Sequence, residues 1–373
     1  MARVRTMFKS GVYRNISTEI NLAFLLMIIA SSLFVGLVFY QLELLLYGSV
    51  RLRADIILMI NLGVGVLVSL RNSLTLNESW TWLAPLFMVF SIILILLDYS
   101  ILGKYLSVVA SIFLFFVATR KFQSEVRLGT LIYVLSSFSL FIGNVLFKEE
   151  LPLNEIIVWW IGFSILSVCA EELLSDRYSR YKNRQPFLAI LVFMWLSGAA
   201  LTHILHTSGW VIVFYILLIQ ALYLLKKELQ TDGIGLYSYS SLFSMASYFW
   251  LAISSISGLY FKYPGNTDFE AVWIEMIFLG FVLNTLVAFW NRWYPTSKGQ
   301  RVSFSEYLLI PFVLFQVSLI ANVIGKVWDV PILVVPGAYG ITASIVILFA
   351  GSFISFIKTF FNADPIVFSK RTR

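Results

Sequence analysis

The chain has 373 residues, of which 59% are hydrophobic and 13% are charged, whereas about 25% of the residues in a typical soluble domain are charged. This composition excludes an ordinary soluble globular protein. A formal net charge of +7 would suggest a nucleic-acid partner in a soluble protein. Here Lys and Arg collect in gaps between apolar stretches, where anionic lipid explains them better, so we expect no nucleic-acid partner.

Twelve apolar stretches follow one another along the chain. A helix that crosses a bilayer needs roughly 20 mostly apolar residues. The stretches that meet this condition are 18–43, 53–70, 79–97, 99–119, 128–147, 151–175, 186–205, 208–225, 236–261, 270–290, 304–325 and 331–357. We therefore predict an all-α fold, a polytopic integral membrane helix bundle with about 12 transmembrane helices. The transmembrane domain is predicted over 18–357, between a cytoplasmic N-terminal segment, 1–17, and a cytoplasmic basic tail, 358–373.

Most of the 27 basic residues lie in every second gap between these stretches. One set of gaps, together with both chain ends, holds Arg3, Arg5, Lys9, Arg14, Arg71, Arg120, Lys121, Arg127, Arg177, Arg180, Lys182, Arg184, Lys226, Lys227, Arg292, Lys298, Arg301, Lys358, Lys370, Arg371 and Arg373. The opposite gaps hold only Arg51, Arg53, Lys148, Lys262 and Lys326. Because Lys and Arg near span ends are retained on the cytoplasmic side, we predict that both termini are cytoplasmic in a multi-pass protein of the cell membrane.

Charged residues are almost absent from the middle of the predicted spans. The polar residues expected at mid-depth are neutral, namely Asn61, Gln220, Asn284 and Gln316. A charge at the bilayer centre costs at least about 2.5–3.5 kcal/mol, so pumps and ion-coupled carriers keep such residues only where they act. The pattern favours a scaffold over a pump, and leaves a channel or a lipid-handling protein open.

The two histidines, His203 and His206, are the candidate cofactor ligands. Their spacing of three places both imidazoles on one helical face near the predicted outer surface. One reading is a pair of interfacial histidines with hydrogen-bond partners, and the others are coordination of one haem iron or metal, or proton handling. A four-coordinate metal site needs further ligands, so we expect no metal centre, and no cofactor unless one haem is held by His203 or His206.

Two further groups are candidate interaction sites. Glu275 lies about one turn inside the outer end of its predicted span, with Lys104 as one candidate partner at similar depth, and together they are a candidate outer-side polar site. A functional carboxylate in an outward cavity is the rival interpretation of Glu275. On the inner side, the basic residues of one connection either determine topology or contact anionic lipid or a cytoplasmic partner; they are Arg177, Arg180, Lys182 and Arg184.

Several local patterns resemble a known family. Leu279-Gly280-Phe281, the following Pro295 and a further span from Tyr307 to Gly325 reproduce the order of a late Leu-Gly-Phe step, a proline and another span. Ala170-Glu171-Glu172-Leu173, followed by Asp176-Arg177, is similar to an acidic and basic step after a middle span, and the short 120–127 connection fits the same layout. With twelve spans, these patterns resemble the NnrS-type relatives of haem–copper oxidase catalytic subunits.

The resemblance implies a haem–copper-like scaffold, yet the ligands of that family are missing. The family binds haem and copper through several histidines, whereas Glu275 stands about where a histidine precedes the Leu-Gly-Phe step, and the position near Phe289 is not histidine either. We therefore expect no catalytic residue and no enzymatic activity of the chain alone. The expected function is a non-catalytic membrane subunit that anchors or docks a redox partner, such as an extracytoplasmic cytochrome or a quinone-reactive assembly.

The expected partners are membrane lipids and other subunits of a membrane electron-transfer complex of the respiratory chain. The residues also leave two alternative functions open. The chain is either a transporter or lipid-handling permease, which would need a water-accessible cavity lined by residues such as Asn61, Asn284 and Gln316, or a membrane protein that keeps one haem on His203 or His206.

Overall fold

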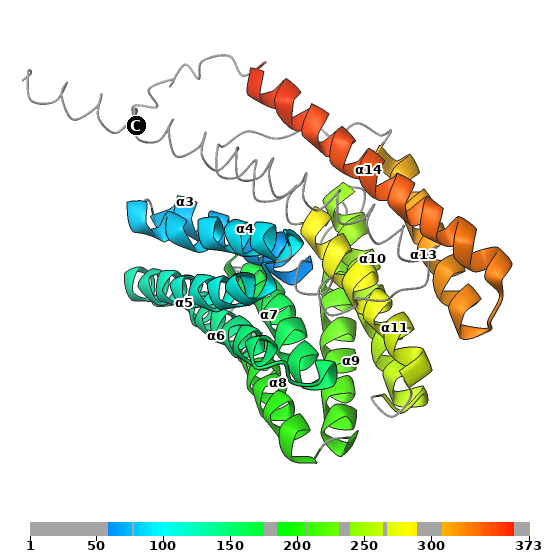
Figure 1. Cartoon of the computed structure of the whole chain (residues 1–373), viewed down its shortest axis with the longest axis horizontal. Helices are drawn as coiled ribbons and strands as arrows, with labels where there is room; N and C mark the ends of the chain where they lie inside the picture. The colour runs from blue at the N-terminus through cyan, green and yellow to red at the C-terminus, as the bar shows by residue number, and fades with distance from the viewer. Residues whose placement is uncertain are drawn as a thin grey trace, which may run out of the picture.

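The computed structural model describes residues 59–76, 78–97, 99–174, 185–205, 207–230, 239–263, 267–288 and 308–361, and every regular element in them is helical (Figure 1). The elements are η1 (Met59–Gly65), α3 (Val66–Leu76), η2 (Ser79–Trp82), α4 (Leu83–Leu96), α5 (Ser100–Ser124), α6 (Leu128–Lys148), α7 (Leu153–Leu174), α8 (Gln185–Leu205), α9 (Thr207–Gln230), α10 (Tyr239–Tyr260), α11 (Thr267–Glu275), η4 (Met276–Leu283), α13 (Leu309–Val327) and α14 (Pro331–Phe361). The all-α prediction is confirmed over these residues.

Within the described ranges, nine helices are long and apolar enough to cross a membrane. They are Ser79–Leu96, Ser100–Ser124, Leu128–Lys148, Leu153–Leu174, Ser208–Leu229, Ser240–Tyr260, Phe269–Ala288, Leu309–Val327 and Pro331–Gly351. A shorter apolar helix, Ala189–Leu205, coincides with the predicted span 186–205. The predicted span 18–43 lies outside the described residues, so the number of twelve spans stays a prediction.

Several helices extend past the predicted span ends and include basic residues that the sequence pattern placed in gaps. The helix that matches the predicted span 53–70 continues to Leu76 and contains Arg71. In the same way α5 continues to Ser124 and includes Lys121, and α9 continues to Gln230 and includes Lys227. A span predicted from hydropathy ends where the apolar residues end. The helix itself continues further, and the side chains of Arg71, Lys121 and Lys227 bond to residues of neighbouring helices.

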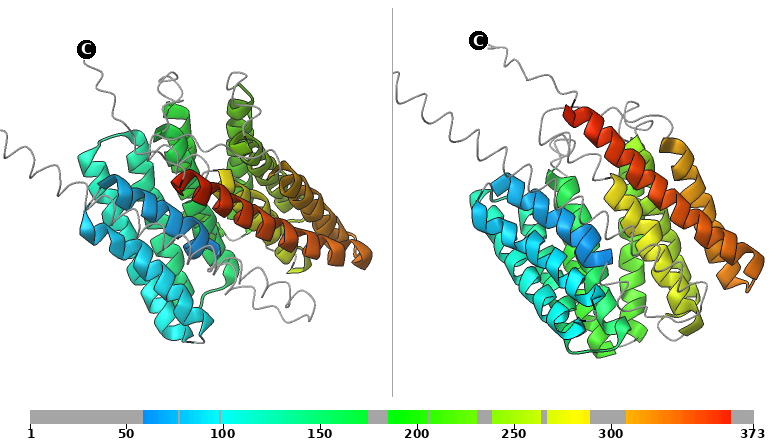
Figure 2. Two further views of the ribbon diagram at one scale, coloured as in Figure 1. Left: turned by 90° about the horizontal axis from the view of Figure 1, so that it is seen from above. Right: turned by 45° about the horizontal axis from the view of Figure 1, so that its top comes forward.

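The helices form one bundle in which α7 is central. In Figure 1, α3 to α6 gather on one side, α10, α11, α13 and α14 lie on the other, and α7 to α9 lie between them. The two views in Figure 2 show the same order. In the apolar window of α7, 89% of the residues are buried inside the protein, against 33% for α13. A helix that is apolar all round and buried lies in the core, so α7 forms the core and α13 lies at the edge.

Two π-helical segments from distant parts of the chain contact each other near the centre of the bundle. These are η1, which precedes α3, and η4, which continues α11. The helix that continues η4 also approaches η1 closely, since a Cβ atom at Gly63 would lie 2.8 Å from Cδ1 of Leu286. Gly280 within η4 faces the ring of Trp250, where an added Cβ atom would lie 2.6 Å from Cγ. Small residues that allow such close approach are typical of helix contacts in membranes.

Candidate functional site

His203 lies near the end of α8, between two residues of α7. The indole Nε1–H of Trp159 donates a 2.8 Å hydrogen bond to Nε2 of His203, and the two rings are stacked. Because Nε2 accepts this bond, the proton of the neutral ring sits on Nδ1, which lies 3.5 Å from Oε2 of Glu155. Both ring nitrogens of His203 therefore have neighbours on α7. His203 thus has the hydrogen-bond partner that one of the interpretations expects, and its position at the membrane interface stays a prediction.

His206, the second candidate ligand, lies outside the described residues. In the part of the chain that the structure describes, no three residues of the types His, Cys, Asp and Glu group together in a way that could hold a metal ion.

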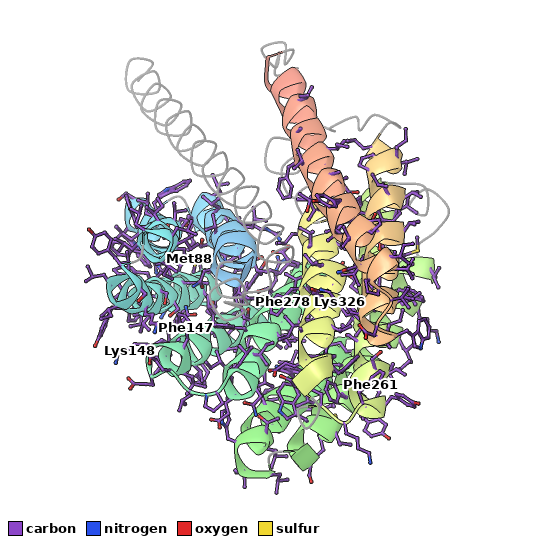
Figure 3. The ribbon with its side chains drawn as sticks, turned by 45° about the vertical axis from the view of Figure 1, so that its right-hand side comes forward. Met88, Phe147, Lys148, Phe261, Phe278 and Lys326 are labelled. Carbon is purple, nitrogen blue, oxygen red and sulfur yellow. The ribbon has the colours of Figure 1, made fainter. Side chains whose placement is uncertain are left out.

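Glu275 and Lys104 are not brought together. Glu275 forms an ion pair with Lys326 of α13 and accepts a 2.9 Å hydrogen bond from Nδ2 of Asn322. Lys104 of α5 instead donates a 2.6 Å hydrogen bond to Glu150 and lies 5.3 Å from the ring centre of Phe147. Figure 3 shows Lys326 beside the helix that carries Phe278, with Phe147 on the other side of the molecule. The predicted outer-side site is therefore two separate ion pairs.

Three of the four predicted mid-depth amides, Asn61, Asn284 and Gln316, belong to two different hydrogen-bond networks. In the first, Nε1–H of Trp160 donates to Oδ1 of Asn144 at 3.1 Å, and Nδ2 of Asn144 donates to the carbonyl of Ser107 at 3.1 Å and to Oδ1 of Asn61 at 3.4 Å. The asparagines and the tryptophan in this network are fully buried. Asn144 is the residue that sequence reasoning missed, since an asparagine inside an apolar span gives no pattern of its own.

The second network joins α10, α13 and the helix of η4. Nε1–H of Trp250 donates to Oε1 of Gln316 at 2.8 Å, and Nε2 of Gln316 donates to Oδ1 of Asn284, also at 2.8 Å. Nδ2 of Asn284 then donates to the carbonyl of Gly280 at 2.6 Å. Gln220, the fourth predicted amide, lies apart from both networks and donates to Sγ of Cys169 at 2.7 Å. These amides hold helices together within the protein.

The adjacent carboxylates at the end of α7 are both neutralised by neighbouring helices. Glu171 forms an ion pair with Arg71 of α3, and Glu172 forms one with Lys227 of α9. Both glutamates are buried, and a buried charge needs a partner of opposite sign. The two pairs therefore fix α3 and α9 to the central helix. The predicted basic cluster of Arg177, Arg180, Lys182 and Arg184 lies outside the described residues.

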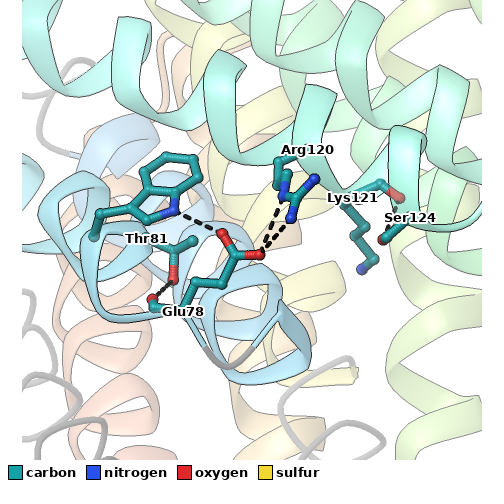
Figure 4. A network of polar contacts seen from close by, with 6 residues as sticks. Glu78, Thr81, Arg120, Lys121 and Ser124 are labelled. Atoms are coloured by element: carbon teal, nitrogen blue, oxygen red, sulfur yellow. Dashed lines mark hydrogen bonds and ion pairs between the residues drawn. The ribbon is translucent and has the colours of Figure 1, made fainter.

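A third contact at this end of the bundle lies at the surface (Figure 4). One carboxylate oxygen of Glu78 accepts a 2.7 Å hydrogen bond from Nε1–H of Trp80, and the other pairs with Arg120 of α5 at 3.1 Å. The hydrogen bond from Trp80, and then the positive charge of Arg120, lower the pKa of Glu78 below its ordinary value. The contact joins the start of η2, which precedes α4, to the end of α5.

The fold and these contacts define an all-helical protein whose polar interior connects its own helices, with nine helices in the described part that are long and apolar enough to cross a membrane. A family model matches the chain over residues 19–356, and it is described as a domain of unknown function (DUF8744). The chain therefore belongs to the DUF8744 family. No match was found among the curated proteins.

Proposed function

We propose that the chain is a multi-pass protein of the cell membrane with twelve spans and both termini in the cytoplasm. Within that membrane it acts as a non-catalytic subunit on a haem–copper-like scaffold. It anchors or docks a redox partner, an extracytoplasmic cytochrome or a quinone-reactive assembly, in an electron-transfer complex. Its partners are the other subunits of that complex and the surrounding lipid.

The observation that supports this proposal most is that the interior amides form hydrogen bonds between helices of the protein itself. Asn61 and Asn284 belong to separate networks, and each network bonds helix to helix. A transport path needs polar groups that face a shared aqueous cavity, and a redox centre needs free ligands. Buried polar groups that bond to one another across helices instead rigidify a protein. Within the described residues these networks leave Nδ2 of Asn61 without a partner, but each of their amide hydrogen bonds joins two helices or two turns of one helix. Rigid positioning is what a docking subunit supplies to its partner.

The geometry of His203 does not fit a haem ligand. Coordination through Nε2 would remove the acceptor of the Trp159 indole, and coordination through Nδ1 would replace the proton that faces Glu155. Each change leaves a partly buried polar group without its partner, which costs about 1–3 kcal/mol. A haem bound through His206 alone is the remaining form of that alternative.

A second candidate function, a transporter or lipid-handling permease, is favoured by one observation. The two π-helical segments η1 and η4 contact each other, and π-helical turns occur frequently at functional sites. In transporters, irregular helix segments from two halves of the chain meet at the substrate site. This candidate requires the η1–η4 contact to open to water.

Affinity purification of the tagged chain from native membranes tests the leading proposal. We expect it to co-purify with a redox-active partner whose haem or quinone reactivity is absent from the chain expressed alone. Migration of the chain without any redox-active protein would contradict the proposal. A Soret band on the isolated chain that is lost in His206→Gln would instead support haem binding, with His203→Gln as the matched control. Solute or lipid movement across vesicles that hold the chain alone would support the permease.

A further inference from the structure

Lys121 places a buried ammonium group near the end of α5. The side chain is 6% exposed, its Nζ donates a 2.7 Å hydrogen bond to Oδ1 of Asn72 on α3, and it lies 5.0 Å from the ring centre of Tyr133 on α6. Neither of these partners carries a negative charge. Among the residues that the structure describes, no carboxylate lies within ion-pair distance of Lys121. A buried charge without a counter-charge costs several kcal/mol.

The neighbouring charged residues do not correct this excess of positive charge. Arg71, next to Asn72 in the chain, adds a second positive charge that acts on Lys121. The buried carboxylate that pairs with Arg71 is Glu171. Glu125, one turn beyond Lys121, adds an attractive negative charge, but it is a surface residue paired with Arg127 at 2.8 Å and forms no ion pair with Lys121. Among the described residues, Glu171 therefore pairs with Arg71, and no carboxylate forms an ion pair with Lys121.

Two buried donors beside Lys121 are also unused. Oδ1 of Asn72 is taken by Lys121, and Nδ2 of Asn72 has no hydrogen-bond partner among the described residues. The hydroxyl of Tyr133 likewise has none. Both side chains are fully buried, and most buried polar groups in proteins are hydrogen-bonded. The amide N–H of Asn72 and the phenol O–H of Tyr133 lack an acceptor, and the ammonium of Lys121, which donates to a neutral amide oxygen, lacks a negatively charged one.

Arg120, the residue before Lys121, takes no part in this arrangement. In Figure 4 its guanidinium reaches Glu78, whereas the side chain of Lys121 extends from α5 without contacting that carboxylate. The two consecutive basic residues thus have different surroundings. One is paired at the surface, and the other is buried without a counter-ion, which makes Arg120 a matched control for Lys121.

We propose that Lys121, Asn72 and Tyr133 form a binding site for a phosphate group. An oxyanion offers several acceptor oxygens, and charge-assisted hydrogen bonds to it are about twice as strong as neutral ones. The site lies in the last turn of an apolar helix long enough to span a bilayer, which is the level at which lipid headgroups begin. The phosphate is either the phosphodiester of an anionic lipid or free phosphate, because both present the same oxygens.

Thermal unfolding in a neutral detergent tests the site, because a ligand that binds the folded state raises Tm. The probes are inorganic phosphate, phosphatidylglycerol and, as the uncharged-headgroup control, phosphatidylcholine. We expect phosphate or phosphatidylglycerol to raise Tm of the wild type well beyond the effect of phosphatidylcholine. The rise should disappear in Lys121→Met and persist in Arg120→Met. A response to phosphatidylglycerol alone identifies the lipid headgroup, and a response to inorganic phosphate identifies the free anion.

Asn72→Asp provides a second test that does not depend on losing a charge. The substituted carboxylate would sit where Oδ1 of Asn72 now accepts from Lys121, and it would serve as an internal counter-ion. We expect this variant to be at least as stable as the wild type without added anion and to lose the anion-dependent rise in Tm. The proposal is overturned if neither probe raises Tm of the wild type, if Asn72→Asp responds like the wild type, or if Arg120→Met loses the response.

Discussion

Glu275 at the end of α11 and Lys326 in the last turn of α13 form an ion pair that fixes the edge helix α13 to the rest of the bundle. The two side chains are 17% and 18% exposed, and Asn322 supplies a further hydrogen bond to the same carboxylate. Among the long apolar helices of the described residues, α13 is the least buried, so this pair is a main polar contact that holds it in place.

Replacing Lys326 by Met should therefore destabilise the protein by about 3 kcal/mol, because it leaves the Glu275 carboxylate in a largely buried position without its counter-charge. Lys104→Met is the matched control, since its partner Glu150 is 73% exposed and surface pairs contribute at most about 1 kcal/mol. The stability of each purified variant is measured by titration with sodium dodecyl sulfate, with tryptophan fluorescence as the readout of unfolding. Equal losses in the two variants would contradict the difference in burial.

The Glu275 pair also shows which features of the fold can be predicted from the sequence. Apolar length predicts that a helix exists, and nine predicted spans correspond to long apolar helices in the described residues. The position of a residue within its span also predicts its depth in the membrane, and it places Glu275 and Lys104 at similar depth. Depth does not specify which helices are neighbours. Glu275 lies beside α13 and Lys104 lies beside Phe147 of α6, because side-chain packing decides the order of helices around the bundle.

For the same reason, the sequence predicts that these amides lie inside the bundle but does not predict which of them bond to one another. Asn61 and Asn284 were expected as lining of one cavity if the protein is a permease, and the structure places them in different networks. Their partner residues, such as Asn144, leave no periodic signal. Helix ends deviate for a related reason. Arg71 was placed in a gap, but its pairing with Glu171 on another helix allows α3 to continue through it.

Gln316→Leu should cost about 1–2 kcal/mol of stability. The substitution removes an acceptor from the indole of Trp250 and a donor from Oδ1 of Asn284. Hydrogen bonds between membrane helices contribute up to about 1.7 kcal/mol, and stranded partners add a desolvation cost. Gln220→Leu is the control, because Nε2 of Gln220 donates only to the weak acceptor Sγ of Cys169 and its Oε1 has no hydrogen-bond partner among the described residues. Its loss should cost less than the loss of Gln316. The free energies of unfolding of the two variants are measured in the same detergent titration. A larger loss of stability in Gln220→Leu than in Gln316→Leu would contradict the role of the Gln316 network.

Acid should release the contact around Glu78. The hydrogen bond from Trp80 and the charge of Arg120 lower the pKa of this carboxylate from its ordinary value of 4.5. A group with a lowered pKa in the folded state stabilises it fully above its unfolded pKa, and the contribution disappears as pH falls through the folded pKa. Backbone protection of Ser79–Trp82, measured by hydrogen exchange with correction for intrinsic rates, should therefore persist above pH 4.5 and fall below it. Glu78→Gln should show the lower protection at every pH, and protection that is independent of pH in the wild type would contradict the role of the carboxylate.

Gly280→Ala should disturb the centre of the bundle, because the added Cβ atom would lie 2.6 Å from Cγ of Trp250. Trp250 is buried and held by its bond to Gln316, so it has little room to move, and overpacking of this kind costs about 1–3 kcal/mol. Gly198→Ala is the matched control, since its nearest neighbours, on Ile216 and Val213, would lie 3.3 Å away, and alanine favours a helix by up to about 1 kcal/mol over glycine. The same pair of variants separates the two proposed functions. In the scaffold proposal Gly280→Ala lowers stability and also weakens retention of the redox partner, because the partner depends on the fixed arrangement of helices. In the permease candidate it changes transport at η4 even where stability is restored by lower temperature. Unfolding free energy, partner recovery and vesicle transport, measured on the same pair of variants, therefore separate the two functions.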